Sequence, residues 1–468
     1  MDSILAIIFQ NAEKTPDRLC AADGKNSLTY GQYRRRIAGG AAALRDRGLG
    51  SGGRVVIRCT QDTDFLASVH AVQLAGGVAV PVEKGCAQAR VDLIFSATGA
   101  AFVLDPHELS GLASDEVFPL PKPEQPSLIL FTTGTTGASK GVCLRHAADV
   151  AAAENIFYGA KMRPGNIEVC PLPLNHSAGL RRYFSDMLAG GTFVILDGLM
   201  VVRRFFDALD AYAATSVAAS PAALQLIFRL TGDRLGQYAD RLEFMSFGTA
   251  PFPDADKTKL KALLPRTHIY DLFGSTEAGV SCVSEITGPE AAPKCIGRPT
   301  YNASLRILDE NGCDKSATAE DPGLFAWGGA MCMDGYWSEP ELTAETLVGG
   351  YVHTDDLGYR DGTGRVFLLG RADDVINRGG LKIAPGEVED AARGFPGVRE
   401  CVCVSVADEL AGQALRLFYE GQERNPVTFR DFLRSKLEPY KVPSIITHLD
   451  ALPRTYNGKL DSKALRRQ

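Results

Sequence analysis

The residues from Leu128 to Val142 read LILFTTGTTGASKGV, and their types suit the binding of phosphate. An apolar run rich in β-forming residues ends in a loop of threonines and glycines, and Lys140 follows that loop. Glycines let backbone N–H groups approach phosphate oxygens, threonine hydroxyls add hydrogen-bond donors, and a lysine adds positive charge. The segment is not a P-loop, which ends in Gly-Lys followed by Ser or Thr, because Lys140 stands between Ser139 and Gly141. A plain turn of similar composition is the alternative.

Carboxylates and a second lysine recur in three later segments. Residues 270–278 read YDLFGSTEA and contain two carboxylates, those of Asp271 and Glu277. Residues 353–358 read HTDDLG and contain two adjacent carboxylates, those of Asp355 and Asp356. The last segment, LPRTYNGKLD, places Lys459 in a turn that follows a proline.

Each of these segments also has a structural alternative. Ser275 or Thr276 could cap the N-terminus of a helix. The acidic stretch around Asp356 could be a solvated β-hairpin, and Lys459 could be a solvated charge.

The four segments, in this order, resemble the adenylate-forming superfamily, which includes acyl- and aryl-CoA ligases, peptide-synthetase adenylation domains and luciferases. The resemblance extends from Thr29 to Lys459, nearly the whole chain. It implies that ATP binds to a set of loop residues: Thr132, Thr133, Gly134, Thr135, Thr136, Gly137, Gly248, Thr249, Ala250, Asp271, Phe273, Gly274, Ser275, Asp356 and Arg371.

The resemblance also assigns roles around the nucleotide. Phe273 would stack on adenine, and Asp271 would lie near the adenine amino group. Thr276 would bond the α-phosphate and Glu277 would hold Mg²⁺, while Lys140 would add charge at the phosphates.

The loop Ser246-Phe-Gly-Thr-Ala-Pro251 resembles the wall of the adenine pocket. Gly248 would permit close approach to the ring, and Ala250 would keep the wall thin.

Two further roles concern the ribose and a moving domain. Asp356 would chelate the ribose hydroxyls, and Arg371 would reach the ribose or the α-phosphate. The chain departs from the family pattern by placing Asp355 where glycine is common. Asp373 matches the hinge between the two domains, and Lys459 matches the lysine that contacts the carboxylate and α-phosphate during acyl-adenylate formation.

The acid pocket is expected from the segment PLPLNHSAG, in which the resemblance makes His176 a catalytic residue bordering the substrate carboxylate. The expected lining residues are His176, Ser177, Gly179, Ala219, Ser220, Ala223 and Gly248. Arg181 and Arg182 lie opposite an apolar stripe that contains Leu180 and predicts an amphipathic helix. We therefore predict that both arginines are solvated on a helix face, with a clamp for a second substrate carboxylate as the alternative.

The elements that must position these residues alternate between strand and helix patterns. Arg54–Arg58 is strand-like and is followed by a helical pattern, and this alternation, which recurs up to Tyr270, predicts parallel sheets covered by helices. Beyond about Val280, short β-prone runs predict a small β-subdomain. We predict an α/β fold with an N-terminal adenylation domain over residues 1–371 and a mobile α+β domain over residues 372–468.

Bulk properties fit an ordinary enzyme of 468 residues. The net charge of −6 offers no broad basic surface, so nucleic acid is not an expected partner. No apolar run approaches the length of a membrane span, and the N-terminal apolar stretch is not a signal peptide. The eleven cysteines are scattered, which favours reduced thiols and a cytoplasmic location.

The expected reaction is AMP-forming activation of a small carboxylic acid, an aryl acid or a short to medium acyl acid. ATP and Mg²⁺ would support adenylation, and transfer to coenzyme A would follow. The alternative is a stand-alone adenylation enzyme that loads the phosphopantetheine of an acyl carrier protein. A non-catalytic protein on the same fold is disfavoured because Lys459, Glu277 and the threonine loop are all present.

Overall fold

The computed structural model describes residues 2–133, 139–372, 374–378, 381–408, 411–454 and 460–466. The chain divides into two compact units, the first made of Met1–Arg306 with Ala326–His353 and the second of Ile307–Phe325 with Thr354–Gln468. The boundary after Arg371 stays a prediction, since compactness groups residues 354–371 with the C-terminal part.

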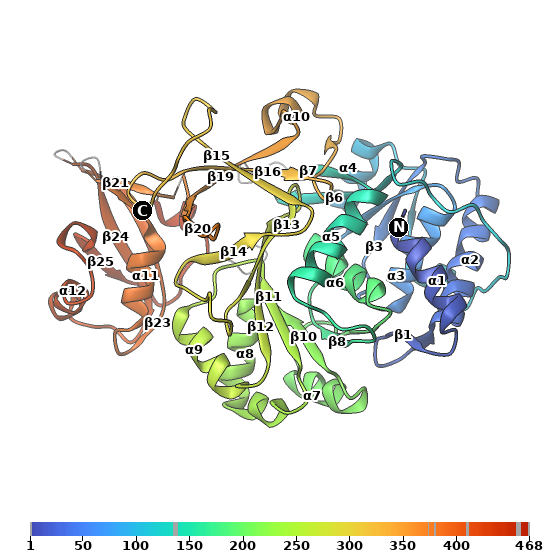
Figure 1. Ribbon diagram of the computed structural model, residues 1–468, viewed down its shortest axis with the longest axis horizontal. Coiled ribbons are helices and arrows are strands. Elements are labelled where there is room, and N and C mark those ends of the chain that lie inside the picture. Colours follow the sequence, from blue (N-terminus) through green and yellow to red (C-terminus); the bar gives the residue numbers. More distant parts are fainter. Residues whose placement is uncertain are drawn as a thin grey trace. The chain divides into compact units, whose positions relative to one another are not determined.

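The larger sheet of the first unit is mostly parallel, and antiparallel strands complete its two ends (Figure 1). In spatial order its strands are β14 (Cys295–Pro299), β13 (Gly279–Glu285), β12 (His268–Ser275), β11 (Phe244–Gly248), β10 (Ser216–Ala219), β8 (Ile167–Cys170), β9 (Thr192–Ile195), β1 (Leu19–Ala22) and β2 (Ser27–Thr29).

A second sheet of the same unit has six strands, and its order also requires crossovers. The strands are β17 (Gly335–Tyr336), β7 (Ser139–Arg145), β6 (Pro126–Thr133), β4 (Val78–Val82), β3 (Arg54–Arg58) and β5 (Phe102–Leu104). The strands from β6 to β5 run parallel, and β7 pairs with β6 antiparallel. The predicted strand at Arg54–Arg58 is confirmed.

Helices cover these sheets, as the β–α alternation predicts (Figure 1). They are α1 (Ile4–Lys14), α2 (Tyr30–Asp46), α3 (Thr63–Leu74), α4 (Gln88–Thr98), α5 (His146–Gly159), α6 (Ser177–Leu188), α7 (Val202–Ala211), α8 (Pro221–Thr231), α9 (Asp254–Leu263) and α10 (Pro340–Thr346). Side-chain caps determine where several of these helices begin. Thr29 and Gln32 form a capping box at α2, and Ser220 caps α8, which begins at Pro221.

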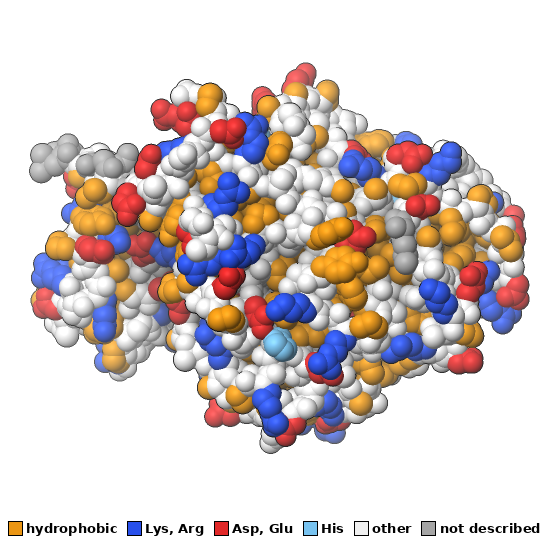
Figure 2. Space-filling view, viewed as in Figure 1, with side chains coloured by type: hydrophobic (Ala, Val, Ile, Leu, Met, Phe, Trp, Pro, Cys, Tyr) orange, Lys and Arg blue, Asp and Glu red, His pale blue; other side chains and the backbone are white. Residues whose placement is uncertain are grey.

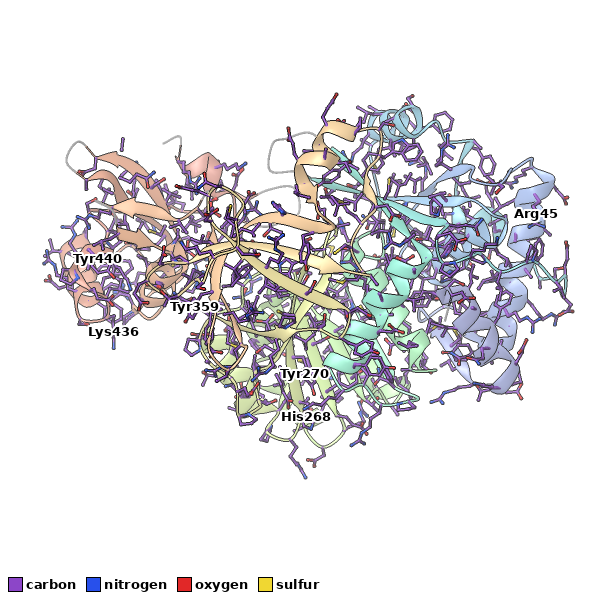
Figure 3. All side chains as sticks on the ribbon, turned by 45° about the horizontal axis from the view of Figure 1, so that its top comes forward. Arg45, His268, Tyr270, Tyr359, Lys436 and Tyr440 are labelled. Atoms are coloured by element: carbon purple, nitrogen blue, oxygen red, sulfur yellow. The ribbon has the colours of Figure 1, made fainter. Side chains whose placement is uncertain are left out.

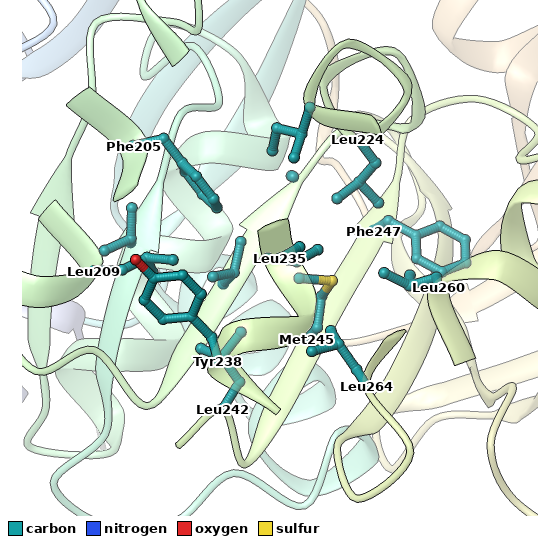
Figure 4. Packing of buried hydrophobic residues seen from close by; sticks show 14 of the residues in the cluster. Phe205, Leu209, Leu224, Leu235, Tyr238, Leu242, Met245, Phe247, Leu260 and Leu264 are labelled. Carbon is teal, nitrogen blue, oxygen red and sulfur yellow. The ribbon is translucent and has the colours of Figure 1, made fainter. Parts of the chain in front are cut away.

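A large apolar core holds the parallel strands that carry the site. Phe205 and Leu209 of α7, Leu224 of α8, and Met245 and Phe247 of β11 are all buried in it (Figure 4). Because β11 and its neighbours are packed on this cluster, the loops that follow them start from fixed positions.

The second unit is α+β, as predicted. One sheet has the order β22 (Leu381–Ile383), β21 (Ile376–Arg378), β24 (Gly412–Gly421) and β23 (Val398–Asp408), and β25 (Ile445–His448) pairs with β24. Helices α11 (Pro385–Arg393) and α12 (Pro426–Arg434) pack on it, and α13 (Ser462–Arg466) follows.

The remaining strands include those of the expected β-subdomain. They are β15 (Ala303–Leu308), β16 (Gly323–Gly329), β18 (Leu347–Val348), β19 (Tyr351–Arg360) and β20 (Val366–Arg371).

The surface and the cysteines agree with the composition. The face in Figure 2 shows acidic and basic side chains interspersed. All eleven cysteines are free thiols. Over the described residues, no helix has both the length and the apolar character that crossing a membrane requires.

Candidate active site

Four neighbouring parallel strands end at one edge of the larger sheet, and the loops after these strands build the candidate site. In register, β8 pairs with β10, β10 with β11, and β11 with β12, all parallel. Ligands of open α/β sheets bind at the carboxyl ends of such strands. The topology therefore gathers at one edge the predicted acid-pocket residues and the predicted nucleotide residues that lie after β8, β10, β11 and β12.

The turn after β12 carries Thr276 and Glu277. It joins β12 to the antiparallel strand β13, so it belongs to a β-hairpin and does not cap a helix. Ser275 Oγ accepts a hydrogen bond from the backbone N–H of Ala278, at 2.9 Å. At Gly274 a Cβ would lie 2.0 Å from the Gly279 carbonyl oxygen, so only glycine fits this approach of the two strands.

Helix α6 begins beside this turn. The side-chain hydroxyls of Ser177 and Thr276 share a hydrogen bond of 3.1 Å. His176 is half-buried at the N-cap position of α6, and Gly179 lies so close to the Pro173 carbonyl that a Cβ would be 2.3 Å from its oxygen. The first turn of the predicted acid-pocket helix thus contacts the predicted α-phosphate residue.

The prediction that Arg181 and Arg182 are solvated is wrong. The two residues are 5% and 2% exposed. Arg181 donates to the carbonyl oxygens of Ser275 and Thr276, at 2.6 and 2.8 Å. Arg182 forms a buried ion pair with Glu168 of β8. Both guanidinium groups are engaged by the protein itself, which also leaves neither free as a clamp for a substrate carboxylate.

Helix α6 has no solvent face of the kind that the prediction assumed. It packs against α1 and α5 as well as against β8 and β9. A helix covered on several sides buries the residues opposite its apolar stripe too, and buried arginines then require partners.

Tyr336 connects Glu277 with Lys140. Its hydroxyl donates to a carboxylate oxygen of Glu277 at 3.1 Å, and the Lys140 ammonium lies 5.5 Å from the centre of its ring. The sequence predicts no role for Tyr336, because nothing local shows that β17 pairs with β7, the strand that begins at Ser139. This pairing places the tyrosine between Glu277 and Lys140.

Glu277 is the predicted ligand of Mg²⁺. Across the described part of the chain, no group of three or more His, Cys, Asp or Glu side chains could hold a metal ion. Mg²⁺ commonly takes one or two carboxylates and completes its shell with substrate phosphates and water. A single carboxylate near residues that are predicted to bind phosphate is compatible with this ion.

The threonine-rich loop follows β6. Thr132 and Thr133 end this strand opposite Lys140 and Ser139 in the register, and Ser139 Oγ donates to the Thr132 carbonyl at 3.0 Å. The predicted phosphate residues of the loop lie outside the described residues: Gly134, Thr135, Thr136 and Gly137.

The loop after β11 has an unusual backbone. Thr249 has a φ of 75°, in the left-handed region that L side chains rarely adopt. At Gly248 a Cβ would lie 2.6 Å from the carbonyl oxygen of Leu272 on β12. Ala250 is exposed, and its place in the adenine pocket stays a prediction.

Alternation along β12 separates its side chains. His268 and Tyr270 stack on one face, with ring centroids 6.4 Å apart (Figure 3). Asp271 points to the other face and lies 3.8 Å from the Lys257 ammonium of α9. Burial raises the pKa of Asp271 to about 6, and the lysine opposes this rise. Phe273 lies against Trp327, with ring centroids 6.1 Å apart.

The remaining predicted acid-pocket residues belong to β10 and α8. Ala219 is buried at the end of β10, Ser220 accepts from the Ala223 N–H at 3.2 Å, and Ala223 is half-buried in the first turn of α8. They reach the same sheet edge as Gly248, because Ala219 pairs with Phe247 in the register.

Asp356 and Arg371 belong to the second unit. They face each other across the β19–β20 hairpin, as the alternative expected, but Asp356 is half-buried and not solvated. Burial raises the pKa of Asp356, and the Arg371 charge opposes this rise. Asp355 forms an ion pair with Arg371, a contact that glycine at this position could not make. Asp373 and Lys459 lie outside the described residues.

Comparisons with known proteins cover both units. The model of the AMP-binding enzyme family matches residues 8–119 and 105–337, and that of the AMP-binding enzyme C-terminal domain matches residues 387–459. A fatty acid–[acyl-carrier-protein] ligase, ScoC of Streptomyces coeruleorubidus, is 28% identical over 98% of this chain and 94% of its own length. A 2-succinylbenzoate–CoA ligase of Geobacillus kaustophilus is 26% identical over 98% of this chain and 96% of its own length.

One solved structure supports the fold. The ATP-bound crystal structure of MatB from Rhodopseudomonas palustris superposes with a TM-score of 0.89 at 22% identity, covering 100% of this chain and 99% of that one.

Proposed function

Because the chain belongs to the family of AMP-binding enzymes, we propose that it activates a carboxylic acid with ATP and transfers the acyl group to a thiol. One oxygen of the acid's carboxylate attacks the α-phosphorus of ATP, and pyrophosphate leaves with the bonding electrons of the broken P–O bond. The thiol sulfur then attacks the acyl carbon of the mixed anhydride, and AMP leaves. The relatives that match over nearly their whole length include acid–thiol ligases, which supports this reading.

The observation that carries the proposal is the hydrogen bond between Ser177 and Thr276. It holds the start of the acid-pocket helix against the turn that we assign to the α-phosphate. A carboxylate bound beside Ser177 would therefore lie next to the phosphorus that it must attack. Holding two reactants in this way lowers the barrier without any covalent step on the protein.

The main obstacle to adenylation is charge, since an anion approaches a polyanion. We assign Lys140, Lys459 and the threonine loop to neutralise the triphosphate, and Glu277 to hold Mg²⁺. Bound there, Mg²⁺ would supply Lewis-acid stabilisation of the phosphate oxygens. No general base is needed, because the nucleophile is already ionised.

The other nucleotide contacts follow the predicted set. Asp271 and Phe273 would contact adenine, and the loop at Gly248–Ala250 would wall the pocket. Asp356 and Arg371 would reach the ribose, and rotation about Asp373 would exchange Lys459 for the thiol between the two half-reactions.

Pyrophosphate exchange tests the proposal. Purified protein is incubated with ATP, Mg²⁺, labelled pyrophosphate and a panel of aryl and acyl acids. We expect label to enter ATP only when a suitable acid is present. Exchange that is independent of acid, or absent with the whole panel, would contradict the proposal.

The thiol is proposed to be coenzyme A, and a carrier-protein phosphopantetheine is the second candidate. The similarity to the 2-succinylbenzoate–CoA ligase favours coenzyme A. The similarity to the carrier-protein ligase ScoC favours the phosphopantetheine of a carrier protein. Turnover with micromolar free coenzyme A would support the first. Turnover only with a holo-carrier protein would support the second.

A further inference from the structure

Two residues one turn apart on α6 hold the same backbone turn. Ser177 bonds the side chain of Thr276, while Arg181 donates to the carbonyl oxygens of Ser275 and Thr276. The turn is therefore fixed both by its side chain and by its backbone. Glu277 follows directly, so any shift of this backbone moves its carboxylate.

The guanidinium of Arg181 has a buried acidic neighbour on α5. Asp149 is 3% exposed, and it and Arg181 attract each other electrostatically. Asp149 also accepts a hydrogen bond of 2.6 Å from Ser127 Oγ on β6. Ser127 lies at the start of β6, the end of the strand away from the threonine-rich loop, so these buried groups tie α5 and the neighbourhood of Arg181 to the β6–β7 sheet.

The charge of Arg181 survives its burial. Desolvation lowers the pKa of Arg181 to about 10, so the guanidinium remains protonated at neutral pH. Its planar fork is suited to donating to two adjacent carbonyl oxygens, which a lysine ammonium cannot do with the same geometry.

We infer that Arg181 is a positioning residue for adenylation: it holds the Ser275–Thr276 backbone against the acid-binding helix, so that Glu277 and the acid face the same phosphate. This inference deepens the proposed function and rests on it. Arg181 acts through the turn, and its charge also attracts the Glu277 carboxylate.

Arg182 provides a matched control. It is the next residue on the same helix, it is equally buried, and it bonds Glu168 on β8 instead of the turn. Changing Arg182 should disturb the core of α6 while leaving the Ser275–Glu277 backbone held by Arg181.

The experiment compares Arg181→Lys, Arg181→Met and Arg182→Lys with the unaltered full-length protein. Pyrophosphate exchange at varied Mg²⁺ and acid gives the half-saturating Mg²⁺, the KM for acid and kcat. We expect kcat to fall about 10- to 100-fold in Arg181→Met with a raised half-saturating Mg²⁺, and a smaller loss in Arg181→Lys. Arg182→Lys should lower the melting temperature without changing the half-saturating Mg²⁺.

Hydrogen exchange provides a readout that does not depend on activity. Without any ligand, amides of the turn at Thr276–Ala278 should exchange faster in the Arg181 variants than in Arg182→Lys. If Arg181→Met does not fold because Asp149 is left unpaired, the double variant Asp149→Asn/Arg181→Met removes both charges and takes its place.

The inference is overturned if the Arg181 variants match Arg182→Lys both in Mg²⁺ dependence and in exchange of the turn. A failure of the proposed function looks different. The unaltered protein would then lack acid-dependent pyrophosphate exchange, while the hydrogen-exchange comparison would still decide whether Arg181 holds the turn.

Discussion

The hydroxyl of Tyr336 donates a hydrogen bond of 3.1 Å to the carboxylate of Glu277, and its ring lies beneath the Lys140 ammonium at 5.5 Å. One side chain therefore contacts both the proposed Mg²⁺ ligand and the lysine proposed for the phosphates. The hydrogen bond engages one oxygen of Glu277, and the carboxylate has a second oxygen that can bind a cation.

Tyr336→Phe should weaken the proposed Mg²⁺ site while retaining the ring beneath Lys140. A hydrogen bond to a charged group contributes about 1.5 kcal/mol or more, so we expect roughly a tenfold rise in half-saturating Mg²⁺. Pyrophosphate exchange at varied Mg²⁺ measures this change. Tyr158→Phe, at an exposed tyrosine, is the control and should leave the value unchanged. Equal values for Tyr336→Phe and the unaltered protein would exclude this role.

Asp271 should make nucleotide binding sensitive to acid. Its pKa is raised to about 6 by burial, so its carboxylate becomes protonated as the pH falls from 7 to 5. A protonated carboxyl is a poorer acceptor for the adenine amino group. Calorimetric titration with ATP should show affinity falling across this range, and Asp271→Asn should bind weakly with a flatter pH profile. Parallel profiles would remove Asp271 from the adenine site.

The Asp271 carboxylate should also make the stability of the fold depend on pH. Lower pH should raise the free energy of unfolding, whereas it lowers the affinity for ATP. The carboxylate's folded pKa of about 6 exceeds the unfolded value of about 3.9, so the folded chain binds the proton more tightly. The stability that this contributes is complete below pH 4 and is lost as the pH rises through about 6. Asp271→Asn should therefore gain about 1.4 kcal/mol in stability relative to the unaltered protein between pH 5 and pH 8. Urea denaturation at the two pH values measures the difference, and no gain would contradict the assignment.

Removing only one partner of the buried Arg182–Glu168 ion pair should strongly destabilise the fold. Arg182→Met leaves the Glu168 carboxylate buried without its cation, which costs about 3–5 kcal/mol. The double variant Glu168→Gln/Arg182→Met removes both charges and should be more stable than Arg182→Met alone. Urea denaturation of the set tests this, and an additive or larger loss in the double variant would show that the two groups are not coupled.

Lys459 should act in one half-reaction. Lys459→Ala should sharply reduce acyl-adenylate formation, because the charge proposed to face the α-phosphate is lost, while thiolation of a supplied acyl-adenylate should be less affected. Rapid-quench assays of each step distinguish these effects. Lys463→Ala, a nearby lysine outside the family pattern, is the control. Equal losses in both steps would count against the assigned role.

The fold and the gathering of site residues were predictable because short motifs follow strands. The strand at Arg54–Arg58, the alternation that produces parallel sheets, and the loops after β6, β11 and β12 are all local patterns. The family membership follows from the same loops. In a parallel sheet the loops after neighbouring strands meet at one edge, which predicts the proximity of the loops after β11 and β12, whereas β6 belongs to the other sheet.

The contacts that were not predictable depend on tertiary packing. Arg181 and Arg182 look solvated because helical periodicity reports one apolar stripe, whereas α6 is covered by helices as well as by the sheet. Tyr336 of β17 contacts Glu277, which lies 59 residues earlier in the chain. Lys257 of α9 contacts Asp271 of the next strand, β12. No local sequence signal marks such partners, although two adjacent arginines beside a buried stripe are a reason to look for acidic residues on neighbouring elements.

The most direct measurement follows an oxygen atom from the acid to the nucleotide. Acids from the panel, labelled with ¹⁸O in the carboxylate, are incubated with the protein, Mg²⁺-ATP and coenzyme A, and the nucleotide products are weighed by mass spectrometry. Attack of the carboxylate on the α-phosphorus predicts AMP carrying one ¹⁸O, together with unlabelled pyrophosphate. ADP with ¹⁸O in free phosphate, or acid-dependent AMP without label, would contradict acyl-adenylate formation.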